Sequence, residues 1–290
     1  QRQMCIRDRV SNPYANVGKM KSYGADGNIS FTQDFTPDFG FTLRGNFTYS
    51  KNKVQNWEQA YLEYPYLEYN NFPYNSIRGY QAVGLFKDED DIKYSPKQTF
   101  GEVMPGDIKY KDLNGDGVID DYDKCLIGQG DVPKIYYGFG ADLQLGDFSV
   151  GALFAGNAKA DRCLGGNAMY PFNDGSGITN LFANITDRWS ADNPTNQDVF
   201  YPRLHHGNNA NQNNMKTSTW WQKDVSFLRL KQLTIAYQLP KKLINQTFLK
   251  SARIYVMGTN LLTFSKFKLW DPELNTNNGT AYPNVRTYSV

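Results

Sequence analysis

The chain has 290 residues, 40% of them hydrophobic and 15% aromatic, and its acidic and basic residues nearly cancel to a formal charge of +2. Basic residues are spread among acidic ones, which argues against a nucleic-acid-binding protein. The longest apolar run, Val150 to Gly156, falls far short of the roughly 18 residues of a membrane-spanning helix. A membrane-spanning strand is compatible with this composition, because it needs only about 9 to 11 residues with alternate ones apolar.

The first nine residues, Gln1 to Arg9, have no hydrophobic period and look like translated adapter sequence. The chain also lacks a basic-then-apolar signal segment at its start, so we expect a native N-terminus to be missing. We therefore interpret residues 1–9 as a non-native leader and residues 10–290 as the part that carries the fold.

A first predicted hairpin lies near the start of this part. Apolar residues alternate with polar ones from Phe41 to Ser50, and the stretch from Ile29 to Phe35 alternates in the same way. Between them, Thr36 to Gly40 contains Pro, Asp and Gly, which favour a turn. The pattern predicts two antiparallel strands joined by a short connection.

Four further segments carry strand patterns. Ile135 to Phe154 predicts a second hairpin, with its turn at Leu145-Gly146-Asp147. The other predicted elements are strands at Phe227 to Tyr237, Arg253 to Phe264 and Val285 to Val290, with a short helical segment near Leu243 to Leu249.

Long polar, aromatic-rich stretches separate these strands, namely Gln55 to Arg78, Asp88 to Pro133 and Asn157 to Ser218. They greatly exceed the usual connection of about 4 to 6 residues. Short turns on one side and long loops on the other are typical of an outer-membrane barrel. The predicted fold is all-β, part of a large antiparallel transmembrane β-barrel with long extracellular loops. A soluble β-sandwich is the alternative, because alternation does not distinguish an apolar face in lipid from one in a protein core.

The sharpest local motif runs from Asp112 to Asp123 and matches the spacing D-x-[DN]-x-[DN]-G, with acidic residues at loop positions nine and twelve. Oxygen atoms at alternate positions can converge on a hard cation while the glycine permits a sharp turn. The predicted ligands of a structural Ca²⁺ are Asp112, Asn114, Asp116, the Val118 carbonyl, Asp120 and Asp123. A calcium sensor is not expected, because no amphipathic helix precedes the loop. An acidic turn without metal is the alternative.

No catalytic site is predicted. The only histidines, His205 and His206, are adjacent and would point to opposite sides of an extended segment, so we interpret them as a plain loop pair. No carboxylate lies in a recognisable enzyme motif, although carboxylates that pair only in the folded chain would escape detection.

Aromatic clusters have two interpretations. They lie at Tyr61, Tyr64, Tyr66 and Tyr69, and at Trp220-Trp221. Flat rings can stack on the apolar faces of sugars, but Trp and Tyr also form girdles at membrane interfaces. We favour a girdle or packing within loops over ligand contact.

Ten short motifs carry a more specific signal. They are Pro105 to Tyr110, Asp187-Arg188-Trp189, Asn193-Pro194, Pro202-Arg203-Leu204, Asp224 to Lys231, Tyr237 to Pro240, Arg253 to Val256, Asn260 to Thr263, Asp271-Pro272-Glu273 and Tyr282-Pro283 followed by Arg286 to Tyr288. Their order and rough spacing resemble the SusC/RagA class of TonB-dependent outer-membrane transporters. The resemblance covers most of the chain from about Asn28.

This resemblance implies a C-terminal barrel portion in the outer membrane of a Gram-negative bacterium. The family has an internal plug, is energised through TonB and works with a SusD-like surface lipoprotein to import oligosaccharides, or peptides in some members. It implies no enzyme activity. We expect the plug, the TonB-contacting region, the early strands and the end of the last strand to be missing.

A partial barrel would have two open edges of unpaired backbone groups, which are costly in lipid. We therefore expect the isolated chain neither to insert properly nor to transport. Two other functions remain open from the sequence: a soluble, calcium-stabilised carbohydrate-binding β-domain, and a glycan-active enzyme with dispersed carboxylates.

Overall fold

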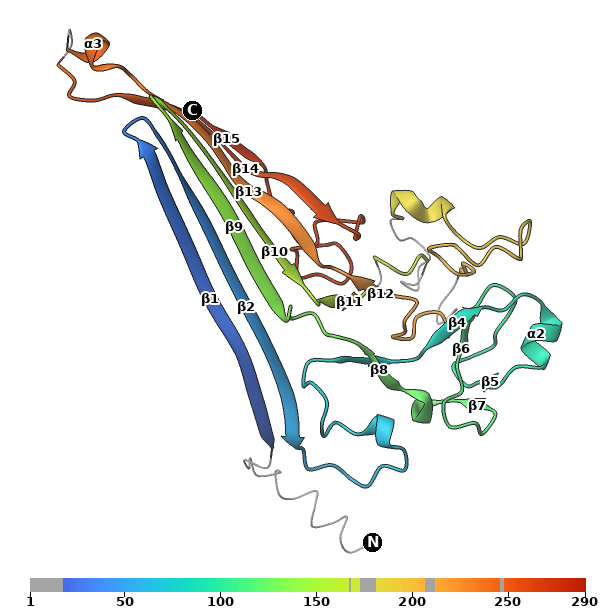
Figure 1. Ribbon diagram of the computed structural model, residues 1–290. Coiled ribbons are helices and arrows are strands. Elements are labelled where there is room, and N and C mark those ends of the chain that lie inside the picture. Colours follow the sequence, from blue (N-terminus) through green and yellow to red (C-terminus); the bar gives the residue numbers. More distant parts are fainter. Residues whose placement is uncertain (1–17, 167, 173–180, 207–211, 246–247) are drawn as a thin grey trace, which may run out of the picture.

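The computed structural model describes residues 18–166, 168–172, 181–206, 212–245 and 248–290. The leader predicted at residues 1–9 lies outside the described residues. The described chain has two parts, a tall curved sheet and an irregular body packed beside one end of it (Figure 1). We call them the wall and the loop body.

The wall is a seven-stranded sheet with the order β1-β2-β9-β10-β13-β14-β15. Each strand pairs antiparallel with its neighbours. The all-β, antiparallel prediction is therefore confirmed. The strands are β1 (Lys19–Thr36), β2 (Phe39–Asn56), β9 (Ile135–Leu145), β10 (Phe148–Ala158), β13 (Phe227–Gln238), β14 (Arg253–Ser265) and β15 (Thr287–Ser289).

Both predicted hairpins are present, but β1 and β2 are 18 residues long. At about 3.3 Å per residue such a strand is roughly 60 Å long, so even with a tilt near 45° it exceeds the roughly 30 Å apolar core of a bilayer. The helix predicted near Leu243 to Leu249 forms earlier, as α3 (Lys241–Ile244), directly after Pro240 with φ −60°. The last strand is shorter than predicted, because only Thr287 to Ser289 pair with β14.

The wall has one apolar and one polar face. On β2, Leu43 lies opposite Phe31 of β1 and Ala141 of β9, whereas the preceding Thr42 lies opposite Thr32 and Asp142. The same alternation continues across the sheet, so the apolar side chains share one face. Exposed apolar side chains on that face include Ile29, Phe31, Leu43, Phe47, Phe139, Phe148, Ile235, Val256, Leu262 and Phe264.

The apolar face argues against the soluble-sandwich alternative. A sandwich would cover this face with a second sheet, yet every other sheet among the described residues has only two strands. A large exposed apolar surface of this kind fits contact with lipid or with another protein. None of the helices in the described part of the chain has the length and apolar character needed to cross a membrane.

The loop body is built from the long stretches between β2 and β9 and between β10 and β13. Its two-stranded sheets pair β3 with β8, β4 with β6, β5 with β7 and β11 with β12. Its elements are η1 (Pro65–Leu67), β3 (Ile77–Gly79), β4 (Ala82–Leu85), α2 (Glu89–Lys93), β5 (Lys97–Gln98), β6 (Ile108–Tyr110), β7 (Val118–Ile119), η2 (Asp121–Asp123), β8 (Cys125–Gly128), β11 (Asp161–Cys163), η3 (Ala183–Thr186) and β12 (Gln222–Asp224).

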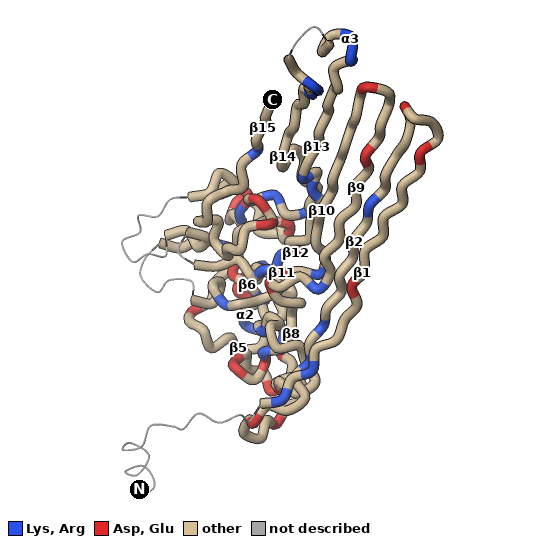
Figure 2. Tube along the Cα trace, turned by 90° about the vertical axis from the view of Figure 1, so that its left-hand side faces the viewer, with Lys and Arg blue, Asp and Glu red and all other residues tan. Residues whose placement is uncertain are grey.

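The main hydrophobic core lies in the loop body and not behind the wall. Its buried members are Tyr80, Leu85, Ile108, Tyr110, Ile119, Ala160, Leu164, Met169, Tyr201, Trp221 and Val225, with Phe267 from the segment after β14. Charged residues are also denser in the loop body than along the wall (Figure 2). The stretches predicted as long loops therefore form a folded unit of their own.

Candidate functional site

A buried ion pair joins the two long stretches of the loop body. Asp107 is fully buried, and its carboxylate accepts hydrogen bonds from Arg203 Nε at 2.9 Å and Nη2 at 3.0 Å. Asn214 Nδ2 donates a third hydrogen bond to Asp107 at 2.9 Å, and Asn214 Oδ1 accepts one from the Ile108 amide at 2.8 Å. A bidentate pair of this kind fixes the orientation of the guanidinium relative to the carboxylate as well as the distance between them. Two of the family-like motifs therefore meet here.

A third motif packs on the same place. Gly106 has φ +87°, and a Cβ there would lie 2.3 Å from Trp189 Cδ2. The Gly106 carbonyl accepts a hydrogen bond from the Arg203 amide at 2.7 Å. Only glycine combines this backbone conformation with such a close indole ring. These motif residues stabilise the loop body.

Polar side chains inside the loop body are closely hydrogen-bonded. Gln98 Nε2 donates to the Ile108 carbonyl at 3.0 Å, and its Oε1 accepts from the Tyr110 amide at 2.7 Å. Trp221 is buried in the core, with Nε1 donating to the Asn214 carbonyl at 2.6 Å. Burial raises the pKa of Tyr110, so its hydroxyl stays protonated. Of the interpretations of Trp220-Trp221, loop packing is the one that holds for Trp221.

A second ion-pair cluster fixes the wall to the segment that follows β14. Arg229 of β13 is buried and pairs with Asp271, and its Nη1 lies 3.3 Å from Glu273 Oε2. Lys231 Nζ lies 2.8 Å from the same Glu273 oxygen. The basic motif of β13 and the Asp-Pro-Glu motif are therefore partners in space.

The tyrosine cluster lies in the loop body and not on the apolar face of the wall. Tyr64 and Tyr66 stack with ring centroids 5.4 Å apart, and the Arg78 guanidinium lies 4.5 Å from the centre of the Tyr69 ring. Burial, with a smaller contribution from Asp123, raises the pKa of Tyr66 to about 12. Tyr61 is 92% exposed. Loop packing describes most of this cluster, and Tyr61 is accessible to a ligand or partner.

The predicted calcium loop forms a tight turn. Asp112 Oδ1 accepts a hydrogen bond from the Gly115 amide at 2.6 Å, and Oδ2 accepts one from the Gly117 amide at 2.8 Å. Asp116 Oδ1 accepts from the Val118 amide at 2.8 Å, and Asn114 Oδ1 accepts from the Asp116 amide at 3.1 Å. The structure therefore brings the first ligands of the predicted set into one turn.

The two remaining acidic residues of the predicted ligand set, Asp120 and Asp123, accept hydrogen bonds from backbone amides and so hold the turn in shape. Buried Asp123 accepts from the Leu113 amide at 2.7 Å and from the Asp120 amide at 2.9 Å. Asp120 Oδ1 accepts from the Tyr122 amide at 2.8 Å. Within the described residues, no three His, Cys, Asp or Glu side chains converge closely enough to hold a metal ion. Calcium binding therefore stays a prediction.

The predicted histidine pair lies on the surface. His205 and His206 are both exposed on an irregular segment, and the His206 ring lies 6.2 Å from the Phe172 ring. This placement agrees with the interpretation of a plain loop pair.

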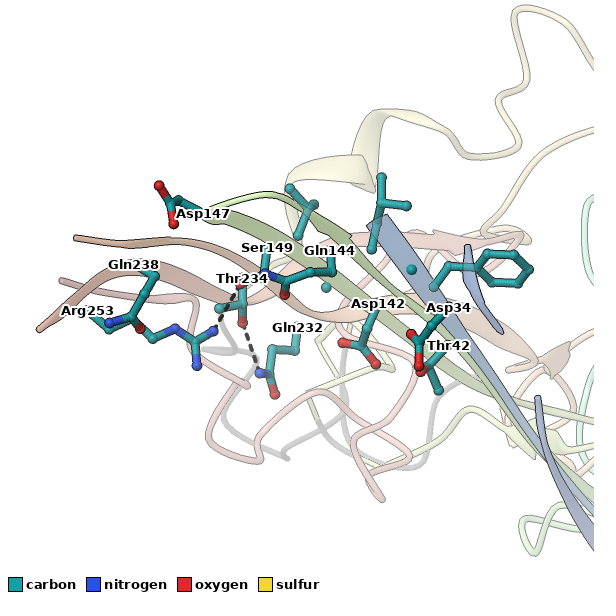
Figure 3. Close-up of a pocket in the computed structure, with 15 residues that line it drawn as sticks. Asp34, Thr42, Asp142, Gln144, Asp147, Ser149, Gln232, Thr234, Gln238 and Arg253 are labelled. Atoms are coloured by element: carbon teal, nitrogen blue, oxygen red, sulfur yellow. Dashed lines mark hydrogen bonds between the residues drawn. The ribbon is translucent and has the colours of Figure 1, made fainter. Parts of the chain in front are cut away.

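The polar face of the wall contains a hollow of about 520 Å³ near its short turns (Figure 3). Arg253 Nη2 donates to Ser149 Oγ at 3.1 Å, and Gln232 Nε2 donates to Thr234 Oγ1 at 3.0 Å. Its polar lining residues are Asp34, Thr42, Asp142, Gln144, Asp147, Ser149, Gln232, Thr234, Gln238 and Arg253. The alternation in the sequence predicts that the wall has a polar face. It does not predict which residues of the six strands lie together in the hollow, because that depends on strand register.

Two curated proteins are similar in sequence, although no protein-family model matches the chain. TonB-dependent receptor P3 of Formosa agariphila is 27% identical over 308 aligned residues, covering 97% of this chain and 29% of the receptor. TonB-dependent receptor P26 of the same organism is 30% identical over 231 residues, covering 73% of this chain and 22% of the receptor. The chain thus spans less than a third of the length of these relatives.

The solved structures that are similar in fold belong to the same class of protein as the sequence relatives. The RagAB peptide importer in its open-open state matches 95% of this chain and 28% of the solved chain, with a TM-score of 0.69 and 25% identity. The RagAB peptide transporter matches the fold with a TM-score of 0.71 at 24% identity, over 95% of this chain and 29% of the solved chain. These relatives are named as receptors or importers and not as enzymes. Together the similarities identify the chain as a SusC/RagA-like segment of a TonB-dependent transporter.

Proposed function

We propose that this segment forms part of the wall and the surface loops of a TonB-dependent importer in the outer membrane of a Gram-negative bacterium. The two-faced wall is the observation that carries the proposal. Its apolar face suits lipid, and its polar face suits an aqueous lumen. The packed loop body at one end would then lie at the cell surface, with the short turns on the periplasmic side (Figure 1).

The proposed cargo is an oligosaccharide or a peptide, captured with a SusD-like lipoprotein. The solved RagAB relatives support a peptide cargo by their names. Exposed aromatic side chains on the loop body, such as Tyr61, support a surface that contacts cargo or the lipoprotein. TonB would act on the full-length protein.

The importer proposal is tested by producing the full-length transporter in an outer membrane and measuring uptake of labelled oligosaccharides and peptides. Uptake that disappears when tonB is deleted, together with co-purification of a surface lipoprotein, is the expected result. A full-length protein that is stable without detergent and remains outside the membrane would contradict the proposal.

We further propose a structural calcium ion in the turn from Asp112 to Asp123. The positive φ angles of Gly115 and Gly117, +79° and +83°, support a turn that can wrap around a cation. Each carboxylate oxygen that accepts an amide has a further lone pair for a metal. Asp112, Asn114, Asp116 and the Val118 carbonyl would bind the ion directly, and Asp120 and Asp123 would hold the turn in shape.

Tb³⁺ luminescence provides a test, because the Tyr66 hydroxyl lies close enough to feel the charges of Asp112 and Asp116, and its ring can sensitise a bound lanthanide ion. We expect the full-length protein to enhance Tb³⁺ emission and Ca²⁺ to compete. Asp116→Ala should abolish the signal, and Asp147→Ala in a wall turn should leave it unchanged. Emission that is equal in both variants would contradict a calcium site here.

A further inference from the structure

The apolar face of the wall ends in lysines where β1 and β2 approach the loop body. Lys21 of β1 lies opposite Lys53 of β2, and Tyr23 lies opposite Lys51. Directly paired residues share a face, and so do alternate residues along a strand, so these four lie on the same face as Leu43. Lys21 is exposed, and Lys51 and Lys53 are partly exposed. We call these three lysines the lysine cluster, and Figure 2 shows basic residues at this end of the two strands in blue.

No acidic side chain accompanies the lysine cluster on this face of β1 and β2. Uncharged residues occupy the rest of the face as far as the turn that joins the strands, namely Tyr23, Ala25, Gly27, Ile29, Phe31, Gln33 and Phe35 of β1 and Phe39, Phe41, Leu43, Gly45, Phe47 and Tyr49 of β2. Within the described ranges, the lysines that form ion pairs are Lys109, Lys124 and Lys231. Three positive charges thus lie together without a carboxylate partner from the described part of the chain.

The length of the apolar face places the lysine cluster at the level of lipid headgroups. Phe35 stacks on Phe39 beside the turn at the other end of β1. At about 3.3 Å per residue and a tilt of about 45°, the stretch from Tyr23 to Phe35 spans about 28 Å of membrane thickness. The apolar core of a bilayer is about 30 Å thick, and tyrosines are typical of its interfaces. With Tyr23 at the interface, the lysines that flank it lie in the polar layer.

Lysine side chains suit phosphate at this depth. The alkyl stem can lie along the apolar surface while the ammonium group reaches the polar layer. An ammonium group donates up to three hydrogen bonds and binds phosphate as a compact point charge. An acidic protein is a less suitable occupant, because the face below the lysine cluster is apolar as far as the turn and suits acyl chains. A phosphorylated lipid combines both chemistries in one molecule.

We propose that the lysine cluster binds the phosphate groups of a glycolipid in the outer leaflet. This inference rests on the proposed importer function, because that function puts the loop body, and the lysines beside it, at the cell surface. The bound lipid would fix the depth of β1 and β2 in the membrane.

The test uses the full-length transporter in detergent, with lipid A as the probe. Native mass spectrometry measures the binding of lipid A, of dephosphorylated lipid A and of an acidic peptide. The triple variant Lys21→Gln, Lys51→Gln and Lys53→Gln removes the charges of the lysine cluster. The corresponding triple arginine variant keeps the charges and shows whether charge alone accounts for binding.

The matched control is the triple variant Lys87→Gln, Lys93→Gln and Lys97→Gln. It makes the same change of charge on three exposed lysines at and beside α2, in the loop body and away from β1 (Figure 1). TonB-dependent uptake is measured in parallel for the wild-type protein and for each variant.

We expect the affinity for lipid A to fall at least about tenfold in the triple glutamine variant of the lysine cluster and on dephosphorylation of the lipid, with less than about a twofold change in the arginine variant and the control. Unchanged affinity in the glutamine variant would overturn the lysine cluster as a lipid site. Cluster-dependent binding of the acidic peptide that is as tight as binding of lipid A would overturn lipid as the occupant. A wild-type protein without TonB-dependent uptake would instead refute the importer proposal, and the lipid titration measures the lysine cluster separately from that result.

Discussion

The wall exposes many of its apolar side chains, whereas the loop body buries its own in a core. The wall leaves side chains such as Phe31, Leu43 and Phe264 exposed on its apolar face. The loop body buries Ile108, Tyr110 and Trp221 in a core closed by ion pairs and buried amides. The difference fits two environments, because the exposed face of the wall suits an apolar surrounding whereas the loop body buries its apolar residues away from water.

The largest effect should come from breaking the buried ion pair of the loop body. Arg203→Ala leaves the carboxylate of Asp107 buried and uncompensated, which should cost about 3–5 kcal/mol. Amide hydrogen exchange of the full-length protein should show faster exchange in the loop body and little change in the wall.

The control is the double variant Asp107→Leu with Arg203→Met, which removes both charges and should recover part of the lost stability. Equal acceleration of exchange in wall and loop body for Arg203→Ala would contradict the separation of the two parts.

The next largest effect should distinguish the two faces of the wall, by comparing the same substitution at two neighbouring residues. Leu43→Arg places a charge on the apolar face and should cost up to about 2–4 kcal/mol, depending on its depth in the bilayer. Thr42→Arg places the same charge on the polar face near Asp142 and should cost much less. Urea unfolding of the full-length protein from lipid vesicles measures both, and equal costs would contradict a lipid-facing surface.

A smaller effect is expected for glycine substitution in the loop body. Gly106→Ala introduces a strained backbone and a clash with Trp189, with a cost of about 1–3 kcal/mol for the strain alone. Gly115→Ala is the matched control, because Gly115 has φ +79° and nothing within 4 Å of the added Cβ. Thermal unfolding without calcium should show the larger loss for Gly106→Ala, and a ranking in the reverse order would refute the packing role of Trp189.

The smallest effect concerns pH. Burial raises the pKa of Asp91, but hydrogen bonds from Lys109 and the Lys87 amide outweigh it, so the folded pKa lies below 3.8. Hydrogen bonds from Lys124 and Tyr80 likewise lower the pKa of Asp121. Because both folded pKa values are lowered, their stabilisation is present above about pH 4 and is lost as pH falls through those values. Hydrogen exchange compared at pH 5 and pH 3 should show weakening at α2 and η2, and Asp91→Asn should reduce that difference at α2.

The wall could be predicted from the sequence because its signal is local. Period-two alternation in Phe41 to Ser50 and Ile135 to Phe154 marks strands whatever the rest of the chain does. The loop body has strands of two to four residues, too short to show a period. Its defining contact joins Asp107 to Arg203, 96 residues later, and no local pattern reveals that pairing.

The candidate sites likewise include one that a local sequence pattern predicts and one that only the folded chain reveals. The turn at Asp112 to Asp123 was predicted from its spacing, and its glycines adopt the expected positive φ. The hollow on the polar face of the wall has no signal in the sequence, because Asp34, Asp142 and Gln232 come from separate strands and meet only through strand register. Trp221 was ambiguous in the sequence, because an aromatic side chain alone does not distinguish a core from an interface.

Spin-label accessibility along β2 tests the account most directly. Nitroxides are placed one at a time from Phe41 to Tyr49 of the full-length transporter in lipid vesicles. The two-faced wall predicts that oxygen accessibility peaks at Phe41, Leu43, Gly45 and Phe47, and that a water-soluble nickel chelate reaches Thr42, Arg44, Asn46 and Thr48 better. Accessibility without a period of two, or nickel access to both faces, would contradict a wall with one side in the membrane.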